Sequence, residues 1–227
     1  MTKESVIEFK DVTIFQGESA VISNLNLTLN KGEFVYLLGK TGSGKSSLLK
    51  TIYGDIELKK GTCEVAGFKL HNLKRKEIPF LRRKLGIVFQ DFQLLSDRNV
   101  FENMRFVMKA TGWTDEVKIK NRVKEVLLKV GLEGKEQVMS FQLSGGEQQR
   151  VSIARALIND PEIILADEAT GNLDPETSEE ILKILLAISK QGCCILFATH
   201  DILLYSKFPS RTLMCDNHLV SDSISLK

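Results

Sequence analysis

Residues 39–46 read GKTGSGKS, which fits the pattern GxxxxGK[ST] of loops that hold nucleotide phosphates. Glycines let backbone N–H groups turn toward a phosphate, and the dipole of a following helix attracts the same anion. Lys45 is placed to reach the β- and γ-phosphates, and Ser46 to offer its hydroxyl to Mg²⁺. A chance match is expected in roughly one such chain per hundred, so the pattern predicts a nucleoside triphosphate site. The residues assigned to it are Gly39, Lys40, Thr41, Gly42, Ser43, Gly44, Lys45, Ser46 and Ser47.

Two adjacent carboxylates, Asp167 and Glu168, follow the apolar run at residues 163–166. Ligands of α/β proteins bind at the carboxyl ends of parallel strands, so the pair lies where a triphosphate would be held. Asp167 is predicted to hold Mg²⁺, and Glu168 to polarise the water that attacks the γ-phosphate. The alternative is an ordinary solvated strand end, and the phosphate loop in the same chain argues against it.

A third pattern, LSGGE, precedes the helical stretch QQRVSIARALI. Ser144 can cap this helix, and the bare amides of Gly145 and Gly146 can face an anion, although a cap alone needs no second glycine. This pattern resembles the signature of the ATP-binding cassette ATPases, and the rest of the chain agrees with the resemblance from end to end. The signature residues are Leu143, Ser144, Gly145, Gly146 and Glu147.

The resemblance implies how the residues act together. In that family the signature of one subunit closes over the γ-phosphate held by the phosphate loop of another, so a chain with one cassette is expected to form an ATP-dependent homodimer. The expected activity is hydrolysis of ATP, with ATP and Mg²⁺ as cofactors. The expected catalytic residues are Glu168, His200, Gln90 and Lys45, and the expected Mg²⁺ ligands are Ser46, Gln90 and Asp167.

Other positions match the family in chain order. Phe15 resembles the aromatic residue that stacks on adenine, and Gln90 the glutamine that senses Mg²⁺ and the attacking water. Asp174 ends the sequence GNLD, which resembles the D-loop that crosses to the partner subunit. His200 resembles the switch histidine that contacts the γ-phosphate. A lone histidine is more often structural, but its position after a buried strand and before Asp201 favours the switch role.

The elements that must position these residues can be read from hydrophobic patterns. Residues 34–38, 163–166 and 193–198 are short apolar runs, typical of parallel strands covered on both faces. Residues 6–14 and 25–29 alternate apolar and polar side chains, typical of antiparallel strands with one wet face. The expected fold is α/β. With the resemblance, it becomes a P-loop NTPase (RecA-like) parallel-sheet core with an N-terminal antiparallel β lobe.

Helical periodicity follows the strands at residues 45–53 and 176–190, where Gly54 and Gly192 are the expected helix ends. Between Gln90 and Arg155 the chain has helical patterns at residues 99–110 and 116–130 and no convincing buried strand. We therefore expect a single domain over residues 1–227. Its core would comprise residues 1–90 and 156–227, and an inserted helical subdomain would span about residues 91–155.

The composition restricts the partners. Thirty-one basic residues against 29 acidic ones leave a net charge of +2, so no global charge draws the chain to nucleic acid. Basic runs at residues 74–76 and 82–84 could touch nucleic acid or lipid headgroups, yet such runs are usually solvated. Cassettes of DNA repair carry long coiled-coil or zinc insertions, which are not seen here, so no nucleic acid is expected. No stretch reaches the roughly 18 apolar residues of a membrane helix.

Three stretches narrow the resemblance to the FtsE-type cell-division ATPases: residues 78–104, 143–158 and 166–174. The TGNLD sequence is shared with lipoprotein-release and macrolide-export ATPases, which are the alternative. Ala169, Glu147 and Phe15 depart from commoner family residues without removing a catalytic group. The resemblance implies an integral membrane subunit of FtsX type and a peripheral position on the cytoplasmic face of the bacterial plasma membrane. Residues 92–104 are the expected docking segment, with at least two exposed side chains among Phe92, Leu94, Leu95 and Phe101.

Overall fold

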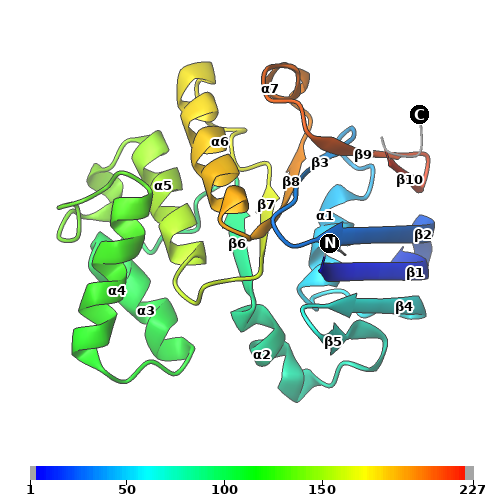
Figure 1. The fold of residues 1–227 in the computed structure, drawn as a ribbon, viewed down its shortest axis with the longest axis horizontal. Helices are drawn as coiled ribbons and strands as arrows, with labels where there is room; N and C mark the ends of the chain where they lie inside the picture. Colours follow the sequence, from blue (N-terminus) through cyan, green and yellow to red (C-terminus); the bar gives the residue numbers. More distant parts are fainter. Residues whose placement is uncertain (1–3, 223–227) are drawn as a thin grey trace.

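A computed structural model describes residues 4–222 as two β-sheets with helices packed around the larger one (Figure 1). The N-terminal sheet is antiparallel, with strand order β2-β1-β4-β5. Leu25, Leu27 and Leu29 of β2 are buried while Asn26 and Thr28 between them are exposed, as the alternating pattern predicts. The strands are β1 (Ser5–Gln16), β2 (Ser19–Asn30), β4 (Lys60–Val65) and β5 (Phe68–Lys69).

The larger sheet has the order β10-β9-β3-β8-β7-β6. Its strands pair in parallel except for β10, which runs antiparallel to β9 at one edge. Every residue of β3 and β8 is buried, because both faces are covered. The strands are β3 (Phe34–Leu38), β6 (Leu85–Phe89), β7 (Ile163–Asp167), β8 (Cys194–Thr199), β9 (Arg211–Asp216) and β10 (Leu219–Asp222). The parallel core and the antiparallel lobe confirm the fold class expected from the sequence.

Seven α-helices and three short 3₁₀ helices lie within the described residues. Polar side chains fix three long helices at their starts, where Asn99, Asp115 and Asp174 accept hydrogen bonds from backbone N–H groups. The α-helices are α1 (Lys45–Ile52), α2 (Ile78–Arg83), α3 (Val100–Ala110), α4 (Glu116–Lys129), α5 (Gly145–Ala156), α6 (Pro175–Lys190) and α7 (Ile202–Lys207). The 3₁₀ helices are Leu70–Asn72, Arg75–Glu77 and Ser140–Gln142.

The alternating sides of β3 separate two hydrophobic cores. Phe34, Tyr36 and Leu38 pack into a cluster with the buried faces of α3 to α6. Val35 and Leu37, on the opposite face, pack with α1 and the antiparallel sheet. The phosphate loop that follows Leu38 therefore leaves a strand held firmly from both sides, which restricts how far the loop can shift.

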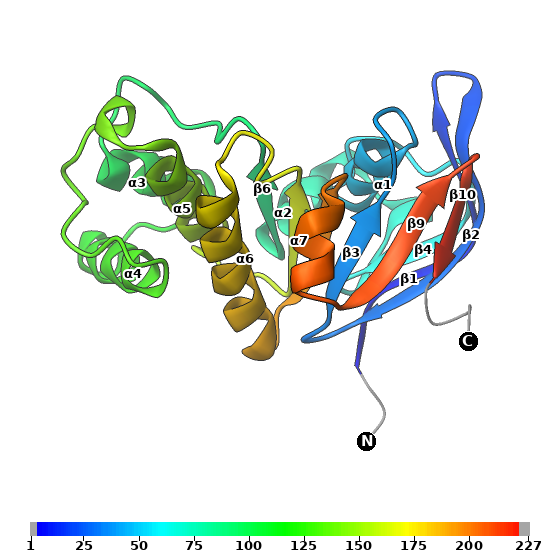
Figure 2. The same ribbon diagram turned by 90° about the horizontal axis from the view of Figure 1, so that it is seen from above.

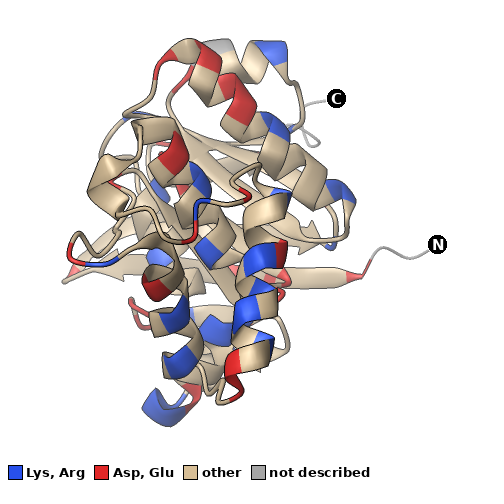
Figure 3. Ribbon diagram, turned by 90° about the vertical axis from the view of Figure 1, so that its left-hand side faces the viewer, with Lys and Arg blue, Asp and Glu red and all other residues tan. Residues whose placement is uncertain are grey.

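Helices α3, α4 and α5 lie together at one end of the molecule, and the antiparallel sheet lies at the other (Figures 1 and 2). The helices expected at residues 99–110 and 116–130 are present as α3 and α4, while the subdomain boundaries themselves remain a prediction. Basic residues lie over much of this end with some acidic residues among them (Figure 3), and Arg105 and Lys109 both pair with Glu116. No helix in residues 4–222 is long and apolar enough to cross a membrane.

Candidate active site

The phosphate loop leaves the carboxyl end of β3 and enters α1 through a turn that requires glycine. Gly44 precedes the helix with φ 106°, in the left-handed region that favours glycine. Gly39 is packed so closely that a Cβ atom would lie 2.4 Å from the carbonyl oxygen of Cys215 on β9. The loop is thus fitted against the neighbouring strand as well as against its own helix.

Lys45 is the buried cation of this loop, with only 4% of its residue surface exposed. Its ammonium donates hydrogen bonds to the carbonyl oxygens of Gly39, at 2.7 Å, and Lys40, at 3.1 Å. The same Nζ lies 3.8 Å from Oε1 of Glu168. The chain therefore holds this cation over the loop, beside the acidic residue predicted to orient water.

Ser46 and Asp167, which are 121 positions apart in the sequence, bring two oxygen atoms together that could serve as metal ligands. The Ser46 hydroxyl donates to Oδ1 of Asp167 at 3.3 Å. Burial raises the pKa of Asp167, while the Ser46 hydrogen bond acts in the opposite direction. A hydroxyl and a carboxylate are the hard ligands that suit a small divalent cation, whose remaining positions would be taken by phosphate and water.

Glu168 turns away from the β7 strand direction and faces a histidine from the next strand. Its backbone adopts φ 51°, and its N–H donates to the carbonyl of Ala198 at 2.9 Å. Its Oε2 lies 3.3 Å from Nδ1 of His200, the residue that follows β8. Because β8 lies between β3 and β7 in the sheet, Lys45 and His200, which are 155 positions apart in the sequence, converge on one carboxylate.

The cavity in front of the loop has a volume of about 370 Å³. Phe15 does not line it, but lies in a separate shallow hollow beside Gly17 and Lys60. Its neighbour Gln16 does line the cavity. The lining residues are Gln16, Val21, Thr41, Gly42, Gly44, Lys45, Ser46, Ser47, Lys50, Asp55, Ile56 and Glu168.

Gln90 follows β6 and is held by a residue that the sequence did not single out. Its Nε2 donates to Oδ1 of Asn172 at 3.0 Å, and Asn172 Nδ2 donates back to the Gln90 carbonyl at 3.1 Å. The packing is tight, since a Cβ on Gly171 would lie 2.9 Å from Gln90 Nε2. The only sequence signal for this pairing was that Asn172 belongs to the GNLD loop.

The signature segment begins α5 with reciprocal capping. Glu147 N–H donates to Ser144 Oγ at 3.2 Å, and Ser144 N–H donates to Glu147 Oε2 at 2.9 Å. Gly146 has a packing reason to be glycine, because a Cβ there would lie 2.5 Å from Cγ2 of Thr177 on α6. None of residues 143–147 lines the phosphate cavity, and α5 and α1 lie on opposite sides of strands β6 to β8 (Figures 1 and 2).

Asp174 also has a local structural role. Its carboxylate accepts a hydrogen bond from the Thr177 backbone N–H at 3.0 Å and so caps α6. Hydrogen bonding from the Thr177 side chain, and then from its backbone N–H, lowers the pKa of Asp174. The cap fixes the carboxylate at the end of the loop that carries Asn172, the partner of Gln90.

The exposure expected of the docking segment was wrong. Phe92, Leu94, Leu95 and Phe101 are all half-buried, and Leu94 and Phe101 pack against the larger core. The nearest well-exposed aromatic side chain is Phe106 on α3, with 51% of its surface accessible. Three of the four residues lie in the loop before α3, and Phe101 lies in the first turn of α3, beside the buried stripe that contains Val100, Met104 and Met108.

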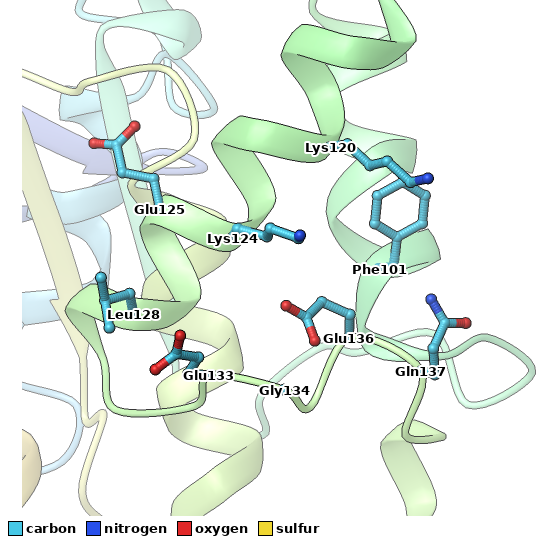
Figure 4. Close-up of a pocket in the computed structure, with 9 residues that line it drawn as sticks. All are labelled: Phe101, Lys120, Lys124, Glu125, Leu128, Glu133, Gly134, Glu136 and Gln137. Carbon is cyan, nitrogen blue, oxygen red and sulfur yellow. The ribbon is translucent and has the colours of Figure 1, made fainter.

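Two hollows lie outside the phosphate cavity on the helical side. One, of about 700 Å³, lies between α4 and the loop after it, with Lys120 and Lys124 of α4 on one side and Glu133 and Glu136 of the loop on the other (Figure 4). The other, of about 290 Å³, separates α2 from α3 and α5. Its lining residues are Pro79, Arg82, Arg83, Leu85, Gly86, Ile87, Val107, Ala110, Thr111, Arg155, Ala156 and Asn159.

Comparisons with known proteins agree with this geometry. The ABC transporter family matches residues 22–171. The chain is 41% identical over 214 residues to the cell division ATP-binding protein FtsE of Streptococcus pneumoniae serotype 2, covering 94% of this chain and 93% of that protein.

Two solved cassettes share the fold. The first is cbiO1 of Clostridium perfringens, part of the transporter complex cbiONQ, with TM-score 0.88 and 29% identity over 96% of this chain and 88% of cbiO1. The second is MJ0796, solved as a dimer in a post-hydrolysis state with ADP and Pi, with TM-score 0.81 and 34% identity over 95% of this chain and 96% of MJ0796. The sequence match, the shared fold and the phosphate-loop geometry lead to one conclusion: the chain belongs to the ATP-binding cassette family and is an ATP-hydrolysing, nucleotide-binding subunit.

Proposed function

We propose that Glu168 orients the attacking water, with Lys45 on the β- and γ-phosphates and His200 and Gln90 at the γ-phosphate. The observation that carries this proposal is the convergence on one carboxylate. Glu168 lies 3.8 Å from Lys45 Nζ and 3.3 Å from His200 Nδ1, beside the Ser46–Asp167 pair. A positioned carboxylate of this kind contributes on the order of 10²- to 10⁴-fold to the rate.

Ser46 and Asp167 would hold Mg²⁺, with Gln90 as a further ligand when ATP is bound. When present, the ion neutralises charge on the β- and γ-phosphates. Lys45 already donates two hydrogen bonds toward the loop carbonyls, so binding of ATP exchanges those acceptors for phosphate oxygens. Asn172 accepts a hydrogen bond from Gln90 Nε2, and the amide oxygen of Gln90 is the atom that would meet the metal, so this hydrogen bond would help to orient the amide.

Two variants test these roles. Lys45→Ala should weaken ATP binding, because it removes the cation that meets the phosphates. Glu168→Gln should keep the dissociation constant for ATP within a factor of about two and lower kcat on the order of 10²- to 10⁴-fold. Equilibrium nucleotide binding and phosphate release are measured on both proteins. Wild-type turnover by Glu168→Gln would overturn the assignment.

In the same proposal, the signature of one subunit would contact the ATP of a second copy, in an ATP-dependent homodimer. The support is that residues 143–147 stand apart from the chain's own phosphate cavity, and that MJ0796 was solved as a dimer. The N-terminus of α5 offers N–H groups and a favourable dipole to an anion supplied from outside the chain. Each active site would then need both subunits.

The membrane partner would be an FtsX-type subunit, in keeping with the similarity to FtsE over nearly the whole chain. The complex would act in cell division and in the control of cell-wall hydrolases, with this chain peripheral on the cytoplasmic face of the plasma membrane. The alternative, a lipoprotein-release or macrolide-export transporter, shares the TGNLD loop and would use the same ATP chemistry.

Docking is proposed at the hollow between α2 and α3. Phe80 and Phe106 are next in sequence to its lining residues Pro79 and Val107, and 55% and 51% of their surfaces are exposed. The charged residues among the lining side chains are all arginines. Arg155 lines the hollow and also donates to the carbonyls of Phe92 and Gln93, in the loop after Gln90. An apolar cytoplasmic helix of the membrane subunit with an acidic side chain fits this surface. Arg155 would then connect the docked helix to the loop after Gln90, and so to the active site.

Charge substitutions test this surface. Phe80→Glu and Phe106→Glu should release the ATPase from vesicles that carry the membrane subunit, because burying an unpaired charge costs several kcal/mol. Leu219→Glu is the matched control, since Leu219 on β10 is equally exposed at 54% but lies at the far end of the sheet. ATP affinity should stay unchanged in all three variants. Retained recruitment of both phenylalanine variants would place docking elsewhere.

A further inference from the structure

Gln149 is a completely buried amide on α5, with no surface exposed. Its Nε2 donates to two backbone carbonyls, one at the end of β6 and the other in the turn after β7. One acceptor is Phe89 O at 3.3 Å, and the other is Ala169 O at 2.5 Å. Phe89 directly precedes Gln90, and Ala169 directly follows Glu168. The Gln149 side chain thus links the backbone next to Gln90 with the backbone next to Glu168, the two residues proposed to act in hydrolysis.

The sheet itself does not hold these two residues together. The parallel pairing of β6 with β7 ends at Phe89 and Asp167, and the chain turns sharply at Glu168, where φ is 51°. Beyond that point the separation of Gln90 from Glu168 depends on contacts from other elements. Gln149 on α5 supplies one such contact, next to the point where the backbone hydrogen bonds between β6 and β7 end.

The orientation of the amide is determined by its neighbours. Flipping it would place Oε1 against two carbonyl oxygens, so Nε2 must face them. Oε1 is then left buried without a hydrogen-bond partner in the described part of the chain. A buried polar group held in this way is rigid, because every alternative rotamer loses donations that water cannot replace.

We propose that Gln149 is a positioning residue for hydrolysis, which fixes Glu168 relative to Gln90 and ties both to the signature helix. The inference rests on the proposed roles of Glu168 and Gln90. Gln149 itself touches neither nucleotide nor water. It acts by keeping the carboxylate and the amide at the separation that aligns the attacking water with the γ-phosphate, where small misplacements lower kcat strongly.

The first test is Gln149→Met, which keeps the length of the side chain and removes both N–H donors. We expect kcat per ATP-binding site to fall at least tenfold, while the dissociation constant for ATP changes less than twofold, because the phosphate loop is not touched. Ser152→Ala is the control: Ser152 is also fully buried on α5, and its hydroxyl has no partner within the described residues. Its kcat should stay within twofold of wild type.

The second test is Gln149→Glu, which has the same shape. An ionised carboxylate would repel the two carbonyl oxygens, whereas a protonated carboxyl can donate to one of them. Burial raises the pKa of the introduced carboxyl, so kcat relative to wild type should recover as pH falls through that pKa. A purely structural role would leave the shape of the pH profile unchanged.

Two results would overturn the inference. One is a kcat per site within twofold of wild type in Gln149→Met. The other, which decides the matter if that variant does not fold, is a Gln149→Glu profile parallel to wild type. Failure of the proposed function is recognised separately, because it requires normal turnover in Glu168→Gln.

Discussion

The phosphate-loop site and the signature segment are built in opposite ways. The first brings together the start of α1 and the ends of β7 and β8 in contacts of 3.3 to 3.8 Å. Its residues are Lys45, Ser46, Asp167, Glu168 and His200. The second completes its hydrogen bonds within a few residues, through the reciprocal cap of Ser144 and Glu147. The reactive groups of the phosphate-loop site already face one another. The signature segment is capped locally but does not line the phosphate cavity of its own chain. In the proposed homodimer, the ATP of the second copy would supply the ligand that the signature lacks.

The largest expected effect is on dimerisation, in which the phosphate-loop site of one copy would meet the signature segment of another. Glu168→Gln with MgATP should dimerise on the order of 100-fold more tightly than with ADP, because the γ-phosphate bridges Lys45 of one copy and Ser144 of the other. Light scattering over a concentration series measures this. Adding Ser144→Arg, which fills the helix N-terminus, should return the protein to monomer while ATP binding persists. A dimer equally populated with ADP would contradict the bridge.

A smaller effect concerns the packing of the signature segment. Gly146→Ala should lower the free energy of unfolding by about 1–3 kcal/mol, because the new Cβ would lie 2.5 Å from Thr177 Cγ2. Urea unfolding measures the change. Gly145→Ala is the control, since its nearest neighbour would be Leu173 Cδ2 at 3.4 Å, an ordinary contact. Thr177→Ser removes the offending methyl group and should restore most of the loss. Equal effects at both glycines would show that helix-start geometry, not this contact, requires them.

The smallest expected effect is the contribution of the Glu147 charge, in the cap of α5, to the free energy of unfolding. The Ser144 backbone N–H and then Lys135 lower the pKa of Glu147. A lowered folded-state pKa means that the contribution is full above the unfolded pKa and is lost as pH falls through the folded one. Glu147→Gln keeps the capping hydrogen bond and removes the charge. The free energy of unfolding of the wild type should exceed that of the variant by about 0.5–1 kcal/mol at neutral pH. The difference should disappear at pH values below the usual pKa range of glutamate. A gap that is constant from pH 7 to pH 3 would rule out an electrostatic origin.

Much of the phosphate-loop region could be predicted from the sequence. The apolar run at residues 34–38 and the GKTGSGKS loop after it require a buried strand, a glycine turn and a helix, and the structure has β3 and α1 there. The partner of Gln90 could not be predicted, because Asn172 lies 82 positions away and no local pattern marks an amide pair. The burial of the four apolar side chains in residues 92–101 was also predicted wrongly, because a half-buried apolar residue and an exposed one look the same in the sequence.

The sequence by itself determined the elements and the chemistry available at their ends, because periodicity and glycine placement act over a few residues. Only the tertiary structure decided which ends meet. The strand order places β8 between β3 and β7, and so brings His200 and Lys45 to opposite oxygens of Glu168. It also places Gln149 between Phe89 and Ala169. Such contacts arise from the packing of whole elements against one another, and a one-dimensional pattern does not record that packing.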